Sequence, residues 1–286
     1  MQAETIIRGL TMGSLAGLLF GVGLRITIEE VMASLRRCRL ALIVAVNFIV
    51  VPALAVAAIK VFAIGPEVAT GMILLAAAPF APVVPIFARM ARADLPLAAG
   101  LTALFPLLSA FLTPLIVAVA LKAVSHAGAS RFDTSEILLT LLGVISLPLG
   151  IGMVVKRFAP TLGRWALRPV EIVSEAAGAM SLAFVTFTEW PAIQTTGWVS
   201  LLVMGLLCEL WLSLGWMIGG PDRAARRVIG LGTSNRNIAL ALLVSLESFG
   251  GTAVVPTVVA NGLLLILLGL IHVACWRFGP NRSVGS

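Results

Sequence analysis

The sequence predicts an all-α polytopic membrane protein with about nine transmembrane helices. Hydrophobic residues make up 59% of the 286-residue chain, above the roughly 45–50% of soluble domains. Charged residues make up only 12%, against about a quarter in soluble domains. So little charge could not cover the surface of a soluble fold of this size. We therefore expect one membrane domain over residues 1–286, surrounded by the lipid bilayer.

Nine stretches are long and apolar enough to cross a bilayer, which takes roughly 20 residues of helix. Charged or turn-rich gaps separate these stretches, and the gaps are too short to hold a soluble domain. The predicted spans are 6–24, 40–60, 68–88, 95–121, 136–155, 169–188, 195–219, 228–246 and 252–275.

The Lys and Arg residues sort between the two sides that nine spans create. One side has Arg8, Lys60, Lys122 and Arg131. Because cytoplasmic loops carry the excess of Lys and Arg, we expect the N-terminus outside, the C-terminus in the cytoplasm, and a location in the cell inner (plasma) membrane. The other side, predicted to be cytoplasmic, has Arg25, Arg36, Arg37, Arg39, Arg89, Arg92, Lys156, Arg157, Arg164, Arg168, Arg223, Arg226, Arg227, Arg277 and Arg282.

Several classes of function are not expected. The net charge of +7 comes without a long basic run, so it does not indicate a nucleic-acid partner. Cys38, Cys208 and Cys275 have the spacing of neither a disulfide framework nor a metal site. The HExxH, GxSxG and P-loop motifs are absent from the sequence, so we do not expect an enzyme.

An internal repeat is predicted from two matching segments. Gly65-Pro66-Glu67 precedes the third span and Gly220-Pro221-Asp222 precedes the eighth, 155 positions later. Two spans that are five apart in order enter the membrane from opposite faces, so the repeat is inverted, as in many secondary transporters. We expect repeat one over about 6–121 and repeat two over about 136–275.

Both matching spans are predicted to be broken in mid-membrane. The first has Pro79, Pro82 and Pro85, and each proline removes a backbone donor and clashes with the preceding turn. The second has Thr233 to Asn237, the most polar stretch inside any span. Broken backbone at this depth occurs where protein buries it or water reaches it, so a binding site at the breaks is favoured over two merely kinked helices.

Arg236 lies near the middle of the second of these spans. Because a charged side chain inside a membrane is costly, we expect it to have either a counter-charge or a functional role. Glu209, at similar depth in the preceding span, is the predicted partner in a charge pair. The alternative is a free Arg236 that binds an anion. Asn47, Thr102 and Asn261 of other spans either form isolated helix–helix hydrogen bonds or line one cavity with Thr233, Ser234, Asn235 and Asn237. The candidate substrate-binding residues are Thr233, Asn235, Arg236, Asn237 and Asn261.

Several segments together resemble the bile acid:sodium symporter family, from about residue 17 to residue 270. Phe20 to Leu24 resembles the glycine-rich end of an early helix of that family. Asn47 precedes Pro52 where family members commonly have Gln. Each segment alone is a modest match, and the resemblance is specific because the segments occur in the family's order and spacing. The remaining segments are Arg36-Arg37-Cys38-Arg39, the turn Ala91-Arg92-Ala93-Asp94-Leu95-Pro96-Leu97 with Thr102-Ala103-Leu104, and the crossover Gly232-Thr233-Ser234-Asn235-Arg236-Asn237-Ile238-Ala239.

The resemblance implies a core domain with two crossing broken helices and a smaller panel domain. It also implies transport of organic anions such as bile acids and related carboxylates or sulfates. Asn47, Thr102 and Ser234 match sodium-binding positions of the family and keep an oxygen, so they are the candidate site for Na⁺, and no other cofactor is expected. Since no carboxylate remains to offset the charge of sodium, we do not expect coupling in the family's manner. Arg236 would then be a fixed cation that favours binding of an anion without sodium.

The sequence thus predicts a secondary transporter of a small organic anion that works by alternating access. One alternative is a proton-coupled or uncoupled carrier or exporter, with Glu209 or Glu175 as the titrating group. Another is a membrane sensor that kept the fold and lost transport. The sequence names neither the substrate nor the direction of transport, and it does not give the oligomeric state.

Overall fold

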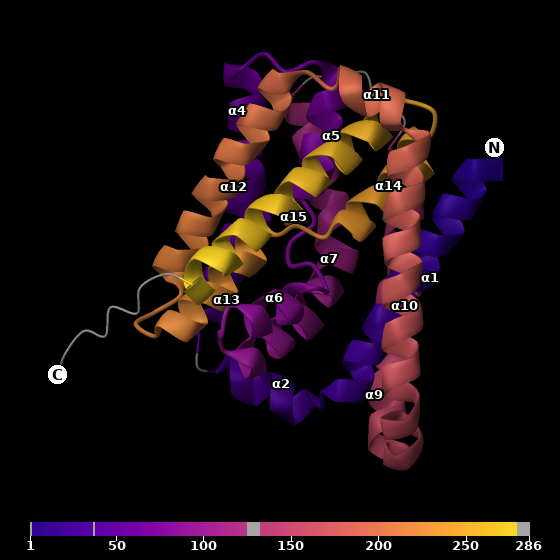
Figure 1. Cartoon of the computed structure of the whole chain (residues 1–286), viewed down its shortest axis with the longest axis vertical. Helices are drawn as coiled ribbons and strands as arrows, with labels where there is room; N and C mark the ends of the chain where they lie inside the picture. The colour runs from indigo at the N-terminus through magenta and orange to yellow at the C-terminus, as the bar shows by residue number, and fades with distance from the viewer. Residues whose placement is uncertain (1, 37, 125–131, 279–286) are drawn as a thin grey trace.

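The structure, a computed structural model, describes residues 2–36, 38–124 and 132–278 (Figure 1). This part of the chain is helical throughout and contains no strand. Three residues of the predicted charge sorting, Arg37, Arg131 and Arg282, lie outside the described residues.

The all-α polytopic fold is confirmed. Eight helices of the described chain are long and apolar enough to cross a membrane, as judged by length and composition. The remaining predicted span, the third in order at 68–88, is divided into two short helices, α5 and α6. The helices are α1 (Gln2–Arg25), α2 (Ile28–Leu35), α3 (Leu40–Ala45), the π-helical turn η1 (Val46–Val50), α4 (Val51–Val61), α5 (Pro66–Ala76), α6 (Val84–Met90), α7 (Leu95–Ala123), α8 (Thr134–Leu141), the π-helical turn η3 (Leu142–Ser146), α9 (Leu147–Phe158), α10 (Pro160–Thr188), α11 (Trp190–Thr195), α12 (Trp198–Ile218), α13 (Arg223–Ser234), α14 (Ile238–Phe249) and α15 (Val254–Phe278).

Polar residues in the short connections start several of the helices. Asp94 accepts from the backbone N–H of Leu97 at the start of α7, and Asp222 caps α13 in the same way. Thr27 and Glu30 form a capping box at the start of α2. The Lys156 ammonium, 2.8 Å from Glu30, and the N–H of Thr27 hold the pKa of the Glu30 carboxyl below its ordinary value.

The helices pack in two groups. The panel group is α1, α9 and α10, and Figure 1 shows the long α10 at one side of the molecule. Gly23 and Gly152 let α1 and α9 approach closely, because a Cβ on Gly23 would lie 2.9 Å from the backbone nitrogen of Met153. The core group is α4 to α7 with α12 to α15.

The two predicted breaks are present, and they cross each other. The first break runs from the end of α5 to the start of α6, and the second from the end of α13 to the start of α14. The N–H of Ala81 donates to the carbonyl of Asn235 (3.3 Å), and the N–H of Asn237 donates to the carbonyl of Ala78 (2.7 Å). These bonds satisfy backbone groups that have left their helices, as buried backbone requires.

A single aromatic ring fills the crossing. Phe80 has a positive φ of 53° and no exposed surface, and its ring stacks on Phe105 with centroids 4.2 Å apart. The ring lies against Gly232 of α13, where an added Cβ would be 2.5 Å from Cδ1 and closer still to Cε1 and Cζ. The crossing therefore requires a glycine at this position.

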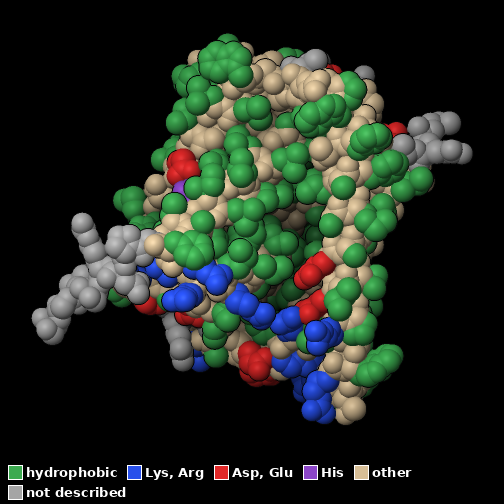
Figure 2. Space-filling view, viewed as in Figure 1, with side chains coloured by type: hydrophobic (Ala, Val, Ile, Leu, Met, Phe, Trp, Pro, Cys, Tyr) green, Lys and Arg blue, Asp and Glu red, His purple; other side chains and the backbone are tan. Residues whose placement is uncertain are grey.

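Basic side chains gather at one end of the molecule (Figure 2). Arg25, Arg89 and Arg168 line the same cavity there, and Lys156 donates to the carbonyl of Arg25 (2.5 Å). We call this end, defined by these four residues, the basic end. It brings together residues that the charge sorting assigned to one side of the membrane.

Candidate functional site

The Arg236 side chain lies at the crossing of the breaks and is 1% exposed. Its Nε donates to the carbonyl of Leu75 (3.2 Å). Nη1 donates to Asn47 Oδ1 (2.9 Å) and to the carbonyl of Thr233 (3.1 Å). Nη2 donates to the carbonyls of Asn47 (3.4 Å) and Ala76. A guanidinium has five N–H donors, so each of them has an acceptor in the protein and none is left for a substrate in this conformation.

The carbonyl of Asn47 is available because of a local defect in the helix around it. Asn47 lies in the π-helical turn η1, where the N–H of Val51 bonds to the carbonyl of Val46 instead of that of Asn47. The next possible donor, Pro52, has no N–H. The Asn47 carbonyl is therefore free to accept from Arg236, while the Asn47 amide nitrogen donates to Thr233 Oγ1 (3.2 Å).

The carbonyls of Leu75, Ala76 and Thr233 come from the C-terminal ends of α5 and α13. The last carbonyls of a helix have no partner within it, and this end of the helix carries a partial negative charge. Trp211 covers the guanidinium from α12, with the Arg236 Cζ 5.6 Å from the ring centroid. Neutral oxygens and an aromatic face thus surround the positive charge.

The predicted charge pair of Arg236 with Glu209 is wrong. Glu209 Oε2 lies 3.0 Å from Nε2 of His272, and the Glu209 side chain is 48% exposed. Glu209 and Trp211 are two positions apart on α12, so they point to nearly opposite sides of a helix with 3.6 residues per turn. Trp211 points inward with no exposed surface, and Glu209 points outward.

This outward position predicts that Glu209→Gln leaves transport of the organic anion expected from the sequence unchanged. The substitution keeps the size of the side chain and touches no residue of the crossing, and such changes at exposed positions typically stay within about 0.5 kcal/mol. Initial uptake rates of the parent and the variant in proteoliposomes check this. A severe loss of uptake, with the amount and Tm of the protein unaltered, would show that Glu209 serves transport.

A cavity of about 360 Å³ lies between the crossing and the panel group. A second cavity of about 400 Å³ extends from it to the basic end. The two have residues of their walls in common, including Leu18, Pro82 and Glu175, and Figure 2 shows the hollow in the face above the basic side chains. The polar residues around the first cavity are Thr11, Ser14, Glu175, Ser181, Asn235, Arg236 and Asn237.

The opposite end of the cavity is closed by contacts between the panel and core groups. Arg8 of α1 pairs with Glu247 of α14 (2.6 Å), and Ile7 is buried beside it. Within the panel group, Thr11 Oγ1 lies 2.6 Å from Ser181 Oγ and joins α1 to α10 at the wall of the cavity. A separate cavity beyond them, lined by Glu4 and others, shares no wall residue with the first.

Asn237 presents a free donor at the cavity. Its Oδ1 caps α14 by accepting from the N–H of Leu240 (3.1 Å), whereas its Nδ2 is buried and bonds to no other described group. The N–H groups of Ile238 and Ala239 belong to the same first turn, where a helix offers them no partner, and both residues line the cavity. A helix N-terminus with free donors attracts negative charge.

The other predicted site residues are dispersed. Thr102 lines the cavity at the basic end, and its buried hydroxyl bonds to no other described group. Ser234 donates to the carbonyl of Leu231 within α13 (3.3 Å). Asn261 donates to the carbonyl of Thr257 within α15 (3.0 Å). Of the three candidate sodium ligands, Asn47 and Ser234 bond to residues of the crossing, with Asn47 donating to Thr233 and Ser234 Oγ accepting from Asn235 Nδ2 (3.4 Å), whereas Thr102 lines the cavity at the basic end.

The hydrogen bonds of Asn235 stabilise the crossing, and its side-chain donor is engaged within the protein. Its Nδ2 donates to the carbonyl of Leu231 (3.1 Å) and its carbonyl accepts from Ala81. Thr233 has both its oxygens engaged by Asn47 and Arg236. Among the predicted substrate-binding residues, Asn237 is the one whose donor is free.

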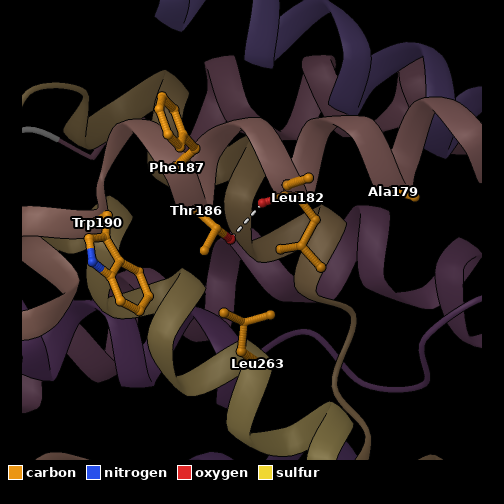
Figure 3. A pocket seen from close by; sticks show the side chains of 7 residues that line it. Ala179, Leu182, Thr186, Phe187, Trp190 and Leu263 are labelled. Carbon is orange, nitrogen blue, oxygen red and sulfur yellow. Dashed lines mark hydrogen bonds between the residues drawn. The ribbon is translucent and has the colours of Figure 1, made fainter.

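An apolar groove lies beside the cavity, between α10 and α15 (Figure 3). Leu182 and Leu263 point toward each other across it, and Trp190 lies at one end. Its only hydroxyl, on Thr186, donates to the carbonyl of Leu182 (2.6 Å). Apart from the indole N–H of Trp190, the groove is lined by apolar side chains and the bonded Thr186 hydroxyl, so it suits an apolar part of a substrate or a lipid chain.

The sequence reasoning missed the polar residues of the panel group. Ser14 Oγ donates to the carbonyl of Ser174 (2.8 Å), and an added Cβ on Gly178 would lie 2.5 Å from Ser14 Oγ. The available signal was the spacing of small residues at 174, 178 and 181 on one face of α10, which typifies close helix packing in membranes.

A comparison with protein families places the chain beside a known one. The sequence profile of the family described as "Sodium Bile acid symporter family" matches residues 13–212, more than half of the chain. A comparison with curated proteins found no match. The matched range includes the first break, and the second break follows it.

Proposed function

Because the chain belongs to the sodium bile acid symporter family, we propose that it is a secondary transporter of a small organic anion that works by alternating access. One observation carries the proposal. Asn237, whose buried amide nitrogen bonds to no other described group, and the first turn of α14 line a cavity at the crossing of two broken helices. Transporters with broken helices use such half-helix N-termini to bind anionic groups of their substrates.

The charges around the cavity favour an anion. Arg25, Arg89 and Arg168 lie along its path to the basic end, with Glu171 and Glu175 as the acidic residues. Arg25 forms a two-point ion pair with Glu171, in which Nη2 and Oε2 are 2.6 Å apart. Basic residues at the mouth of a cleft raise the local concentration of anions.

The substrate class is a carboxylate or sulfate with an apolar body, similar to a bile acid. Apart from the donors at the crossing, the wall of the first cavity is mainly apolar, with Leu18, Ile86 and Leu265 as examples. The two connected cavities, of about 360 and 400 Å³, fall in the range of pockets for drug-sized ligands. The anionic group would bind at Asn237 and the apolar body would extend along α1 and α10.

An inverted repeat accounts for the two crossing helices. Shifted by 155 positions, the end of α5 at Ala76 falls at residue 231, close to the end of α13 at Ser234. The start of α6 at Val84 falls at residue 239, next to the start of α14. This match in helix boundaries supports repeats over about 6–121 and 136–275, related by opposite orientation in the membrane.

The direction of opening follows from the charge distribution. We place the basic end in the cytoplasm by the positive-inside rule, in an inner (plasma) membrane with the N-terminus outside. The conformation described is then open to the cytoplasm and closed outside by Arg8 and Glu247. Movement of the panel group against the core group would expose the same site to the outside.

Counterflow in proteoliposomes tests the proposal. Vesicles loaded with an unlabelled bile acid are expected to accumulate the labelled compound transiently, without any ion gradient, since a carrier exchanges its substrate. Empty vesicles and vesicles with Asn237→Asp are the controls. Substrate binding without any counterflow would contradict the proposal and favour a sensor that kept the fold.

Proton coupling is the second candidate, because Glu175 lines both cavities. The carboxylate lies on the path that an anion follows, so its protonation would lower the repulsion between them. An inward proton gradient would then drive accumulation in the parent, and Glu175→Gln would abolish this effect while keeping counterflow. If the gradient drives the parent and Glu175→Gln equally, Glu175 is not the coupling residue.

A further inference from the structure

Five neutral oxygens converge on one positive group at the crossing. They are the carbonyl oxygens of Leu75, Ala76, Thr233 and Asn47 together with Asn47 Oδ1. We call this set the oxygen cage. The carbonyls of unwound segments and of half-helix C-termini are the groups that hold monovalent cations in transporters built from broken helices.

We infer that the oxygen cage is a site for a monovalent cation that the Arg236 side chain occupies permanently, so that this protein binds its anion without sodium. When the Arg236 side chain is removed, the cage is expected to accept a small free cation such as guanidinium or Na⁺. The consequence for anion binding rests on the proposed function, whereas the binding of a cation by the emptied cage does not.

The charge balance of the cage supports one positive charge. The C-terminal ends of α5 and α13 both contribute, and each helix end carries roughly half a negative charge. Two such ends offset about one unit, which is the charge of a guanidinium. All five acceptors are uncharged, so no carboxylate of the described residues requires a second cation there.

The cage and the anion site are adjacent in the chain. Arg236 fills the cage, and Asn237, the next residue, caps α14 and presents its free donor to the cavity. The N–H of Asn237 also bonds to Ala78 in the other break. A filled cage therefore fixes the backbone that positions Asn237. A free ion would enter and leave such a cage during each transport cycle, so its gradient could drive transport. The Arg236 side chain is covalently attached and stays in the cage, so it cannot couple an ion gradient to transport.

The first test compares the parent protein in NaCl and in KCl. The affinity for a bile acid, measured by the rise in Tm with its concentration, is expected to be the same in both salts. A rise that requires sodium would overturn the inference. If the bile acid raises Tm in neither salt, the proposed substrate fails, and the test with cations described next still decides the inference.

The second test uses Arg236→Ala without any anion. We expect this variant to lose about 10 °C in Tm, because removal of a buried charged group leaves its partners unsatisfied. Guanidinium or methylguanidinium at millimolar concentration is expected to restore Tm, with a rise that grows with the logarithm of the concentration. Na⁺, compared with choline at equal ionic strength, is expected to restore it partly.

Arg227→Ala is the matched control. Arg227 is half-buried, and like Arg236 it donates to a backbone carbonyl, that of Ala91 (2.8 Å), but it lies outside the crossing. Neither guanidinium nor Na⁺ should restore its Tm. Equal restoration in both variants, or none in a folded Arg236→Ala, would contradict the inference.

Arg236→Lys decides the question if Arg236→Ala does not fold. The lysine keeps a tethered cation with fewer donors, so the variant should remain independent of sodium and should not respond to guanidinium. A lysine variant stabilised by Na⁺ over choline would show that the cage is not filled by the side chain and would overturn the inference.

Discussion

Gly232→Ala is expected to prevent stable assembly of the crossing, with a loss of about 3 kcal/mol or more in the free energy of unfolding. The new Cβ would lie 2.5 Å or less from three ring atoms of Phe80. Phe80 has little freedom to move, since its side chain is fully buried, Phe105 stacks on its ring and its backbone has a positive φ. The Tm of the purified variant and its yield in a monodisperse form measure the effect.

Gly205→Ala is the control for Gly232→Ala. Gly205 also lies in a transmembrane helix, but the nearest atom to its added Cβ, Leu264 Cδ2, is 3.9 Å away. We expect no loss there. Phe80→Leu in the Gly232→Ala background should restore part of the stability, because a smaller side chain makes room for the methyl group. If the effects of the two substitutions simply add, the clash does not explain the loss.

The positions of the breaks could be predicted from the sequence because they follow from backbone chemistry. Pro79, Pro82 and Pro85 cannot continue a helix, and a polar stretch with Asn235 and Asn237 offers side chains to free backbone groups. The span positions follow from hydropathy in the same direct way. The α10 helix begins earlier than predicted, at Pro160, since a proline costs no hydrogen bond in a first turn.

The partners of Arg236 could not be predicted, because most of them are backbone carbonyls. Every residue has a carbonyl, so the sequence does not indicate which ones are free. Asn47 is the one side chain among the acceptors, and its role depends on a π-helical turn as much as on its amide. Charge and depth in the sequence point to Glu209, but the face of α12 on which it lies excludes it as the partner of Arg236.

At the crossing, helix ends of opposite polarity face the guanidinium of Arg236 and the cavity proposed to bind an anion. The C-terminal ends of α5 and α13 hold the guanidinium of Arg236, and the N-terminal end of α14 faces the cavity with Asn237. Because the breaks reverse the exposed helix ends at mid-membrane, one short segment supplies acceptors on one side and donors on the other. The oxygen cage and the proposed anion site are thus one residue apart in the chain.

Asn237→Asp follows from this division, and it is expected to abolish anion binding while the fold is kept. Aspartate is as good an N-cap as asparagine, so the bond from Leu240 and the start of α14 should remain. The free amide donor becomes a carboxylate oxygen, which repels the anionic group it would otherwise bind. Loss of one hydrogen bond to a charged group costs about 1.5–3 kcal/mol, so affinity should fall by about 100-fold or more once repulsion is added.

Asn237→Ser separates the two roles of this side chain. The serine hydroxyl can cap α14 and brings no charge, so we expect a stable protein with an intermediate affinity, between those of the parent and Asn237→Asp. Thermal shift with a bile acid measures affinity, and Tm without the ligand measures the cap. If Asn237→Asp binds the anion as tightly as the parent does, then the anionic group is held elsewhere in the cavity, and the basic residues Arg25, Arg89 and Arg168 at its other end become its expected contacts.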